Sequence, residues 1–500
     1  MDHPARSLRS LAALAVALLV ALTAGLAGAQ TLRVGIETPA QLDPAFASAD
    51  AEILVLANVY DYLVDIDAAN EVQPGLAESW EIADEGRTWT FQLRDDVRFH
   101  SGAPLEAEDV VATYDRLRDP DAGLPTGDLY ANVVDVRAED ARTVVFELAE
   151  PNPFFAYDLS DNHAVIHRAD ADEFGSTFDG TGPFRVVAYA PEDRMTLEAV
   201  PDHPFRAPGV DAVELIFFAE QSAAVSALRG GQLDLVLRMP TPLYQSLEGA
   251  PGIERHQVAT NAFDLVRLRS DRAPGNDPRV VQAMKLAVDR ELIVEVVTEG
   301  LGAPGFDTPL GPLYDAWHRP DLAPPAQDVE RARELLAEAG YEDGLELELH
   351  VPDSGDRPDL AAVLAEMLAP AGFDVSIRLQ PESVYYGSDG WLEVDFGITG
   401  WGSRPVPQFY FETMIACDAV WNEAHYCDPE VDALIRTAGS TLDEAERTEA
   451  YAELQRILAA EGPYLIPYFF PQYAAISDAF GGLEVKAFPG RTDLASVHPR

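Results

Sequence analysis

The chain has 500 residues, too many for one hydrophobic core, so we expect at least two lobes or domains. Hydrophobic residues make up 47% of the chain, which excludes wholesale disorder. Asp and Glu number 85 against 35 Lys and Arg, and a surface with a formal charge of −50 repels nucleic acid and anionic lipid. The composition therefore predicts a globular protein with no nucleic-acid partner.

The first 29 residues have the pattern of a secretory signal peptide. Arg6 and Arg9 precede an unbroken apolar run at 11–22, and 27–29 read Ala-Gly-Ala, the small-x-small pattern of a cleavage site. We predict cleavage after Ala29 and a periplasmic mature protein; the alternative is an uncleaved membrane anchor. This region contains no cysteine, so we expect no lipid attached through an N-terminal cysteine, that is, not a lipoprotein.

The mature chain is predicted to begin with short strands and few helices. Alternating apolar residues or turn signals predict strands at 31–36, 80–82, 88–93, 97–99, 133–136, 143–148, 184–189, 195–199, 212–217 and 233–237. Helical periodicity and caps predict helices at 51–63, 106–117 and 222–228.

From about residue 263 the pattern changes to alternating helices and strands. Helices are predicted at 280–299, 329–339, 360–369, 429–438 and 442–460, and strands at 345–350 and 375–379. This alternation is typical of a second α/β lobe with a largely parallel sheet. The apolar segment 463–470 is predicted to be a strand that returns towards the first lobe.

Cys417 and Cys427 are the only cysteines, with nine residues between them. In an oxidising compartment they should form a disulfide, worth roughly 2.5–3 kcal/mol for so short a loop. The alternative is a metal site, for which His425 is the nearest further ligand. Since there is no CxxC pair, we expect no metal.

No motif in the sequence indicates an active site or a cofactor. The segment 300–305 matches GxGxxG, but it follows a predicted helix and Pro304 removes a backbone donor. The acidic stretch 170–175 lacks the ligand alternation of a calcium loop. We therefore predict a protein that is not an enzyme and holds no cofactor; a secreted hydrolase is the remote alternative.

The segment 76–117, LAESWEIADEGRTWTFQLRDDVRFHSGAPLEAEDVVATYDRL, is the longest of several informative blocks. It closely resembles the signature stretch of the extracellular solute-binding proteins of family 5, which include dipeptide, oligopeptide and nickel receptors. Further blocks resembling the family follow its order: 42–44, 180–184, 227–235, 279–290, 332–341 and 421–422. Within these blocks we expect Asp109 to cap or screen a helix start and Asp289-Arg290 to form a pair on a helix surface.

The resemblance implies an α/β, two-lobed periplasmic-binding-protein fold (type II, large cluster C type) with the ligand cleft between the lobes. Lobe I is expected at 30–262 plus 465–500 and lobe II at 263–464, with crossings near 260–265 and 462–467. It also implies a monomeric receptor that closes on a small peptide-like solute and delivers it to the permease subunits of an ABC importer.

The stretch 400–409, GWGSRPVPQF, is the predicted ligand-binding segment. In peptide-binding members of the family, an Asp in this region anchors the amino group of the peptide. This stretch has none, and Val406 stands where related sequences often carry Asp before Pro. Trp401 could stack on the ligand, and Arg404 could pair with a carboxylate or phosphate.

Four further residues are candidate ligand contacts: Trp421 and Asn422, beside the predicted disulfide, and Arg238 and Asn261, at strand ends near a crossing. Because arginines are placed at the predicted site of so acidic a chain, we expect the ligand to carry an anionic group. A receptor for oligosaccharides or for a metal complex, which the family also includes, is the alternative.

Overall fold

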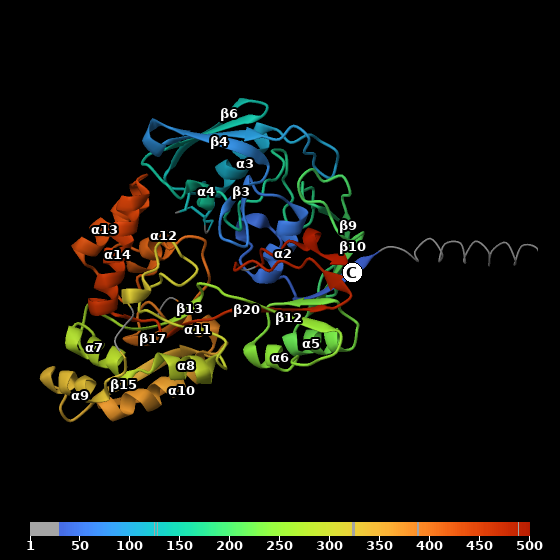
Figure 1. Ribbon diagram of the computed structural model, residues 1–500. Coiled ribbons are helices and arrows are strands. Elements are labelled where there is room, and N and C mark those ends of the chain that lie inside the picture. The colour runs from blue at the N-terminus through green and yellow to red at the C-terminus, as the bar shows by residue number, and fades with distance from the viewer. Residues whose placement is uncertain (1–29, 125, 128, 323–325, 388–389, 489) are drawn as a thin grey trace, which may run out of the picture.

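The computed structural model describes residues 30–124, 126–127, 129–322, 326–387, 390–488 and 490–500 (Figure 1). The predicted signal peptide lies outside these residues. Within the described ranges, no helix combines the length and the apolar character needed to cross a bilayer.

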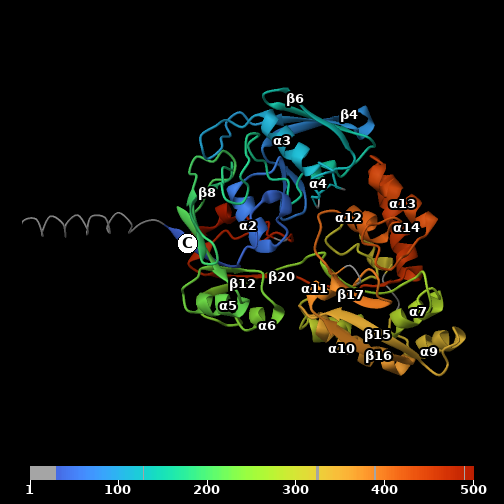
Figure 2. The same cartoon turned by 180° about the vertical axis from the view of Figure 1, so that it is seen from behind.

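The chain forms two lobes, as Figures 1 and 2 show from opposite sides. The first lobe is built on a seven-stranded sheet with the order β12 (Ile253–Val258), β20 (Gln472–Ser477), β11 (Leu235–Leu237), β1 (Thr31–Glu37), β10 (Ala212–Phe218), β9 (Arg194–Ala199), β8 (Phe184–Ala190). A four-stranded antiparallel sheet lies at its far end, in the order β4 (Ala77–Ala83), β5 (Thr88–Leu93), β7 (Thr143–Leu148), β6 (Val133–Asp140). Two-stranded pairs complete the first lobe: β2 (Val64–Ile66) with β3 (Val72–Pro74), and β21 (Phe480–Gly481) with β22 (His498–Pro499).

The second lobe contains the other seven-stranded sheet. Its order is β14 (Ala303–Pro304), β19 (Tyr468–Phe469), β13 (Phe263–Leu268), β17 (Phe396–Trp401), β15 (Leu345–Pro352), β16 (Phe373–Gln380), with β18 (Tyr464–Leu465) also paired to β13. The sheet is mixed rather than largely parallel. β15 runs parallel to β16 and β17, but β13 is antiparallel to β17, β18 and β19, because the segments that enter and leave this lobe pair with each other.

The helices divide between the lobes. The first lobe holds α2 (Asp50–Val59), α3 (Ala107–Leu117), α4 (Phe155–Asp158), α5 (Gln221–Arg229) and α6 (Thr241–Gln245). The second holds α7 (Pro278–Ala287), α8 (Arg290–Val297), α9 (Val329–Glu338), α10 (Arg357–Leu368), α11 (Glu382–Tyr385), α12 (Gln408–Tyr410), α13 (Pro429–Ser440) and α14 (Glu444–Glu461).

Two short connections join the sheets, 259–262 between β12 and β13 and 470–471 between β19 and β20. The strand expected to return to the first lobe at 463–470 instead forms β18 and β19 in the second sheet. A boundary at 464/465 cuts through that sheet, so we propose 470–471 as the second crossing. Below, the first lobe means 30–258 and 472–500, and the second lobe means 263–469.

The helix expected at 280–299 is two helices, α7 and α8. Asp289 begins the second one, because its carboxylate accepts a hydrogen bond from the backbone N–H of Leu292 at 3.1 Å. Arg290 is buried and pairs with the fully buried Asp307 at 2.6 Å. The expectation of an Asp289-Arg290 pair on a helix surface was therefore wrong, whereas Asp109 does accept a hydrogen bond at the start of α3, from the N–H of Glu106. The segment 97–99 forms only an isolated bridge and no strand.

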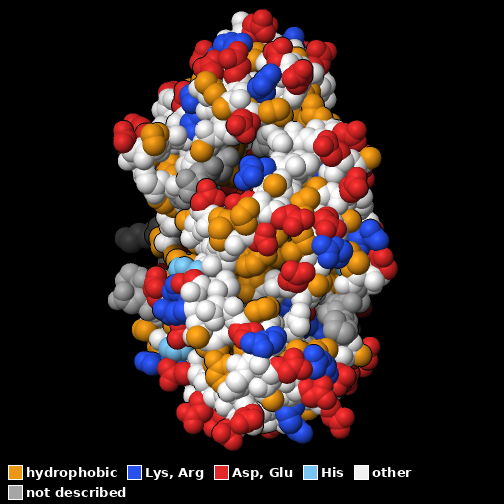
Figure 3. Space-filling view, turned by 90° about the vertical axis from the view of Figure 1, so that its left-hand side faces the viewer, with side chains coloured by type: hydrophobic (Ala, Val, Ile, Leu, Met, Phe, Trp, Pro, Cys, Tyr) orange, Lys and Arg blue, Asp and Glu red, His pale blue; other side chains and the backbone are white. Residues whose placement is uncertain are grey.

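The core of the first lobe extends from the seven-stranded sheet and α2 to the space between the four-stranded sheet and α3. Aromatic side chains from both layers meet there edge to face: Phe91 with Phe146, and Tyr114 with Phe146. On the face drawn in Figure 3, acidic side chains are scattered among polar and hydrophobic ones and gather at the top and the bottom. The aromatic core explains why the block 76–117 carries so many aromatic residues: they build the fold.

Candidate functional site

A cleft lies between the lobes. Two open cavities of about 430 and 660 Å³ share lining residues from both lobes, and a small third one of about 60 Å³ adjoins the second at Asn162, Ser403 and Arg404. The residues common to the two larger cavities are Gln221, Arg238, Gly355, Arg357, Gly402, Ser403 and Gln472. The cavities therefore adjoin one another between the lobes, and together they are called the cleft below.

The second lobe contributes the carboxyl ends of its strands to the cleft. The loop 402–407 follows β17, and 353–356 connects β15 to the start of α10. Because β15 and β17 are parallel neighbours, these two segments emerge at the same edge of the sheet. This edge is where open α/β sheets bind their ligands.

The side chain of Arg404 lies on this edge and borders both the second and the third cavity. Its guanidinium carbon lies 4.2 Å from the centroid of the Phe409 ring, and its carbonyl oxygen accepts a hydrogen bond from the Tyr314 hydroxyl at 2.7 Å. Among the described residues, no carboxylate lies within 4 Å of the Arg404 guanidinium. Val406, the residue expected to stand in place of an acidic anchor, is buried. The loop therefore presents a guanidinium that is not in a salt bridge, although Asp161, which lines the third cavity with it, is near enough for the charge of Arg404 to help lower the pKa of that carboxyl.

Arg238 enters the cleft from the first lobe. It follows β11 in the left-handed backbone region, with φ of 52°, and its N–H donates to the carbonyl of Tyr473 at 2.7 Å. Its guanidinium pairs with Asp50 at the start of α2 and remains half exposed. The charge of Arg238 is thus already balanced within the protein.

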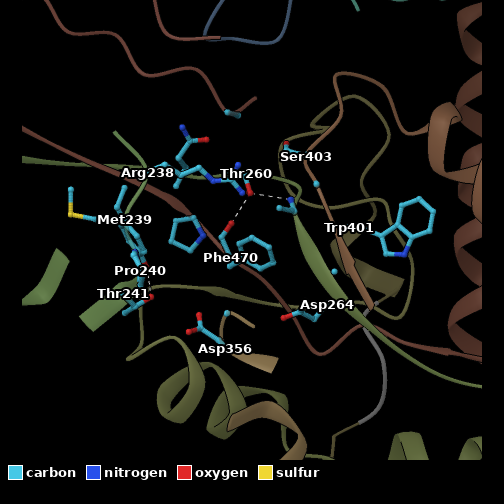
Figure 4. A pocket seen from close by; sticks show the side chains of 18 of the residues that line it. Arg238, Met239, Pro240, Thr241, Thr260, Asp264, Asp356, Trp401, Ser403 and Phe470 are labelled. Atoms are coloured by element: carbon cyan, nitrogen blue, oxygen red, sulfur yellow. Dashed lines mark hydrogen bonds between the residues drawn. The ribbon is translucent and has the colours of Figure 1, made fainter. Parts of the chain in front are cut away.

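Two aspartates that the sequence reasoning missed lie in the same cleft (Figure 4). Asp264, on β13, accepts hydrogen bonds from Arg357 Nε at 3.0 Å and from the Tyr468 hydroxyl at 2.6 Å. Asp356 precedes α10, and its side chain makes no capping hydrogen bond. Burial, together with the carboxylates of Asp264 and Asp359, raises the pKa of Asp356 to about 6. Only their positions could have identified these two residues from the sequence, because they lie at a strand end and at a helix start.

Trp401 borders the cleft, but Figure 4 shows its indole ring pointing away from it. The ring is buried against Phe263 and Tyr410, and its Nε1–H donates to Glu423 at 3.2 Å. Glu423 is fully buried and pairs with the equally buried Arg267 at 3.2 Å. Trp401 is placed by the core of the second lobe, so its ring is not a stacking platform for a ligand in this arrangement.

The other three predicted contacts do not border the three cavities. Trp421 packs beside the rings of Trp401 and Phe409. The amide of Asn422 donates to the carbonyls of Ala416 and Tyr426 at 3.0 and 2.7 Å, which fastens the loop closed by the disulfide. Asn261 is buried at the first crossing, where its side-chain oxygen accepts from the N–H of Leu313 at 3.2 Å.

The disulfide between Cys417 and Cys427 is present, which confirms that prediction. Among the described residues, no group of three or more His, Cys, Asp or Glu side chains is arranged to hold a metal ion.

Comparison with known proteins identifies a family and several similar proteins. The family model described as "Bacterial extracellular solute-binding proteins, family 5 Middle" matches residues 71–422. The di/tripeptide-binding protein 1 of Pseudomonas aeruginosa is 28% identical, over 85% of this chain and 86% of its own length. The periplasmic oligopeptide-binding protein OppA of Salmonella typhimurium is 27% identical, over 91% of this chain and 89% of its own.

Solved structures share the fold at lower identity. The substrate-binding protein CtaP of Listeria monocytogenes superposes with a TM-score of 0.81 at 22% identity, covering 94% of this chain and 99% of that one. The protein AgaA of A. tumefaciens in complex with agropinic acid gives 0.78 at 23% identity, with the same coverages. The two-lobed fold expected from the sequence is therefore confirmed, and the chain belongs to the bacterial extracellular solute-binding proteins of family 5.

Proposed function

We propose that this protein is the solute receptor of an ABC importer and that it captures, between its lobes, a small peptide-like solute bearing an anionic group. Two lobes joined by two short connections suit capture by hinge closure, in which a ligand that contacts both lobes favours the closed form. Relatives that cover most of the chain are named as binders of di- and tripeptides or oligopeptides. Members of this family are substrate-binding proteins, which weighs against a hydrolase.

The position of Arg404 is the main evidence that the solute bears an anionic group. Its guanidinium borders the cleft and, among the described residues, has no carboxylate within 4 Å, in a chain whose acidic residues outnumber its basic ones by 85 to 35. A planar guanidinium pairs with a carboxylate or phosphate through two parallel hydrogen bonds. A ligand carboxylate at this position can form the direct salt bridge with Arg404 that no described carboxylate of the protein forms.

The proposed setting is the periplasm. Cleavage after Ala29 releases a monomeric receptor with no lipid anchor, which meets the permease subunits of the importer by diffusion. Sequencing the N-terminus of the exported protein tests the cleavage, because a mature chain that begins elsewhere than Gln30 contradicts it.

Two measurements test the function. Mass spectrometry of solute released by denaturing the purified protein identifies the cargo and distinguishes a peptide from an oligosaccharide or a metal complex.

Calorimetry then compares the affinities of wild type, Arg404→Ala and a control, Arg436→Ala, for acidic dipeptides and opine-like amino-acid conjugates. Arg436 is an exposed arginine on α13. We expect Arg404→Ala to weaken binding by at least about tenfold, as for loss of a charge-assisted hydrogen bond, and Arg436→Ala to leave it unchanged. Equal affinity in all three proteins contradicts the anionic group, and absence of any bound solute contradicts the receptor function.

A further inference from the structure

We infer that Asn162 is the residue through which the anionic group of the solute contacts the first lobe. On this inference the group is a carboxylate, which Arg404 binds from the second lobe while the side-chain amide of Asn162 donates a hydrogen bond to one of its oxygens. The inference rests on the proposed receptor function and adds to it the contact that closes the lobes on the solute.

Asn162 lies where the second and the third cavity meet. Among the described residues, three border both cavities: Ser403 and Arg404 from the second lobe and Asn162 from the first. Asn162 therefore represents the first lobe at the place where Arg404 borders the cleft. A carboxylate that binds Arg404 between the lobes meets the first lobe at this residue.

The side-chain amide of Asn162 is available to a ligand. Among the described residues, no hydrogen bond is made by this amide, and only the backbone carbonyl of Asn162 is engaged, by the Tyr62 hydroxyl at 3.3 Å. The other first-lobe candidate, Arg238, is already paired with Asp50. Since a carboxylate accepts several hydrogen bonds, an amide N–H can join a guanidinium on the same group.

A tight turn holds Asn162 in place. The carboxylate of Asp161 accepts hydrogen bonds from the backbone N–H of His163 at 3.0 Å and from its Nδ1 at 2.6 Å, so the two neighbours of Asn162 bind each other. The guanidinium of Arg491 donates to the carbonyl of Ser160 at 2.6 Å, which fastens the start of the turn. A contact on so fixed a turn loses little conformational freedom when the solute binds, and this favours affinity.

The charge of Asp161 favours a singly charged ligand group. Asp161 borders the third cavity together with Arg404. Burial works against its ionisation, but the hydrogen bond from His163 and, in smaller part, the charge of Arg404 hold its pKa at about 2, so this carboxylate is ionised at neutral pH. A bound anion therefore meets one negative charge beside the guanidinium. A carboxylate suits this place better than a phosphate group, whose charge at pH 7 is about −1.5 to −2.

The two contacts affect the lobes differently. Arg404 can hold a solute in the open protein, because it belongs to one lobe. The hydrogen bond from Asn162 forms only when the lobes are closed, so it contributes to closure rather than to the first encounter. Loss of the Asn162 amide should therefore lower the affinity by lowering the closed population.

The test uses protein freed of cargo by unfolding and refolding. Calorimetry measures its affinity for three probes: the dipeptide Ala-Ala, its C-terminal amide and its C-terminal phosphonate analogue. Wild type should bind Ala-Ala at least about tenfold more tightly than either analogue. Asn162→Ala should weaken the binding of Ala-Ala by at least about tenfold and that of the amide by less than about twofold.

Two further variants and a second measurement complete the test. Asn162→Asp should bind Ala-Ala more weakly than Asn162→Ala does, because it adds a negative charge beside that of the solute. Small-angle X-ray scattering with Ala-Ala present should give Asn162→Ala a larger radius of gyration than wild type. The matched control is Asn276→Ala, which changes an exposed asparagine of the second lobe that borders none of the three cavities and should behave as wild type.

Each other result overturns the inference. Wild-type affinity for Ala-Ala in Asn162→Ala, equal losses for Ala-Ala and its amide, or a similar loss in Asn276→Ala means that Asn162 does not bind the carboxylate, and binding by wild type leaves the receptor function standing. Tighter binding of the phosphonate than of Ala-Ala contradicts the choice of a carboxylate. If no probe binds, the cargo identified by mass spectrometry replaces them in the same variants, and a cargo without a carboxylate overturns the inference. A protein that yields no cargo and binds no solute fails as a receptor altogether.

Discussion

Phe154 joins the two lobes away from the crossings, and its removal should open the protein. This residue precedes α4 in the first lobe, but its side chain is only 3% exposed, because it packs among side chains of the second lobe. Its ring meets that of Trp317 edge to face at 5.9 Å, and the guanidinium carbon of Arg447 lies 5.0 Å from its centroid. Lobe separation exposes this ring to water, so its burial stabilises the closed arrangement.

The size of the effect follows from these contacts. Burying a phenylalanine side chain contributes about 1.5–3 kcal/mol, and an edge-to-face aromatic pair adds about 0.5–1.5 kcal/mol. Phe154→Ala should therefore shift the balance from closed to open by about 2–4 kcal/mol, roughly 30-fold or more in population. If the closed form binds the solute, the apparent affinity falls with the closed population.

Small-angle X-ray scattering of the solute-free protein measures the opening as a larger radius of gyration, and fluorescence of Trp317 should change with it. The neighbouring residue gives the control. Phe155 is equally buried, but it packs inside the first lobe against Trp89 and Phe146 at 5.5 and 5.3 Å. Phe155→Ala should lower the melting temperature and leave the scattering curve unchanged. If Phe154→Ala keeps the wild-type scattering curve and affinity, Phe154 does not hold the lobes together.

Two further predictions concern the second lobe. Replacing Cys417 and Cys427 by serine should lower the free energy of unfolding by about 2.5–3 kcal/mol, measured by urea denaturation, and an unchanged midpoint argues against any stabilisation by the disulfide. Arg267→Met leaves the buried carboxylate of Glu423 without its partner and should cost about 3–5 kcal/mol, whereas adding Glu423→Gln should recover most of the loss; a double variant no more stable than the single one contradicts this account of the pair.

The sequence predicted most of the elements but not every boundary. The block 76–117 gave β4, β5 and α3 close to their observed positions because its alternation and its helix start agree with each other. The apolar segment 463–470 suits either sheet, and only pairing with β13 assigns it to the second lobe. Helical periodicity continues through Asp289, so the break between α7 and α8 depends on a side-chain cap that periodicity does not show.

The candidate site was predicted in part. Arg238 and Arg404 were expected in the cleft and do border it, because both follow strands at ligand-facing ends. Trp401 ends its strand with the ring turned into the core, which depends on a register that the sequence alone leaves open. Asp356 had no motif to mark it, and its lack of a partner is visible only when the neighbouring charges are placed around it.

The place of Arg404 in the cleft follows from the arrangement of strands. β15 and β17 are parallel neighbours, so the start of α10 and the loop 402–407 emerge side by side at one edge of the sheet. On the proposed function, a solute held by Arg404 therefore lies at this sheet edge, between residues of both lobes.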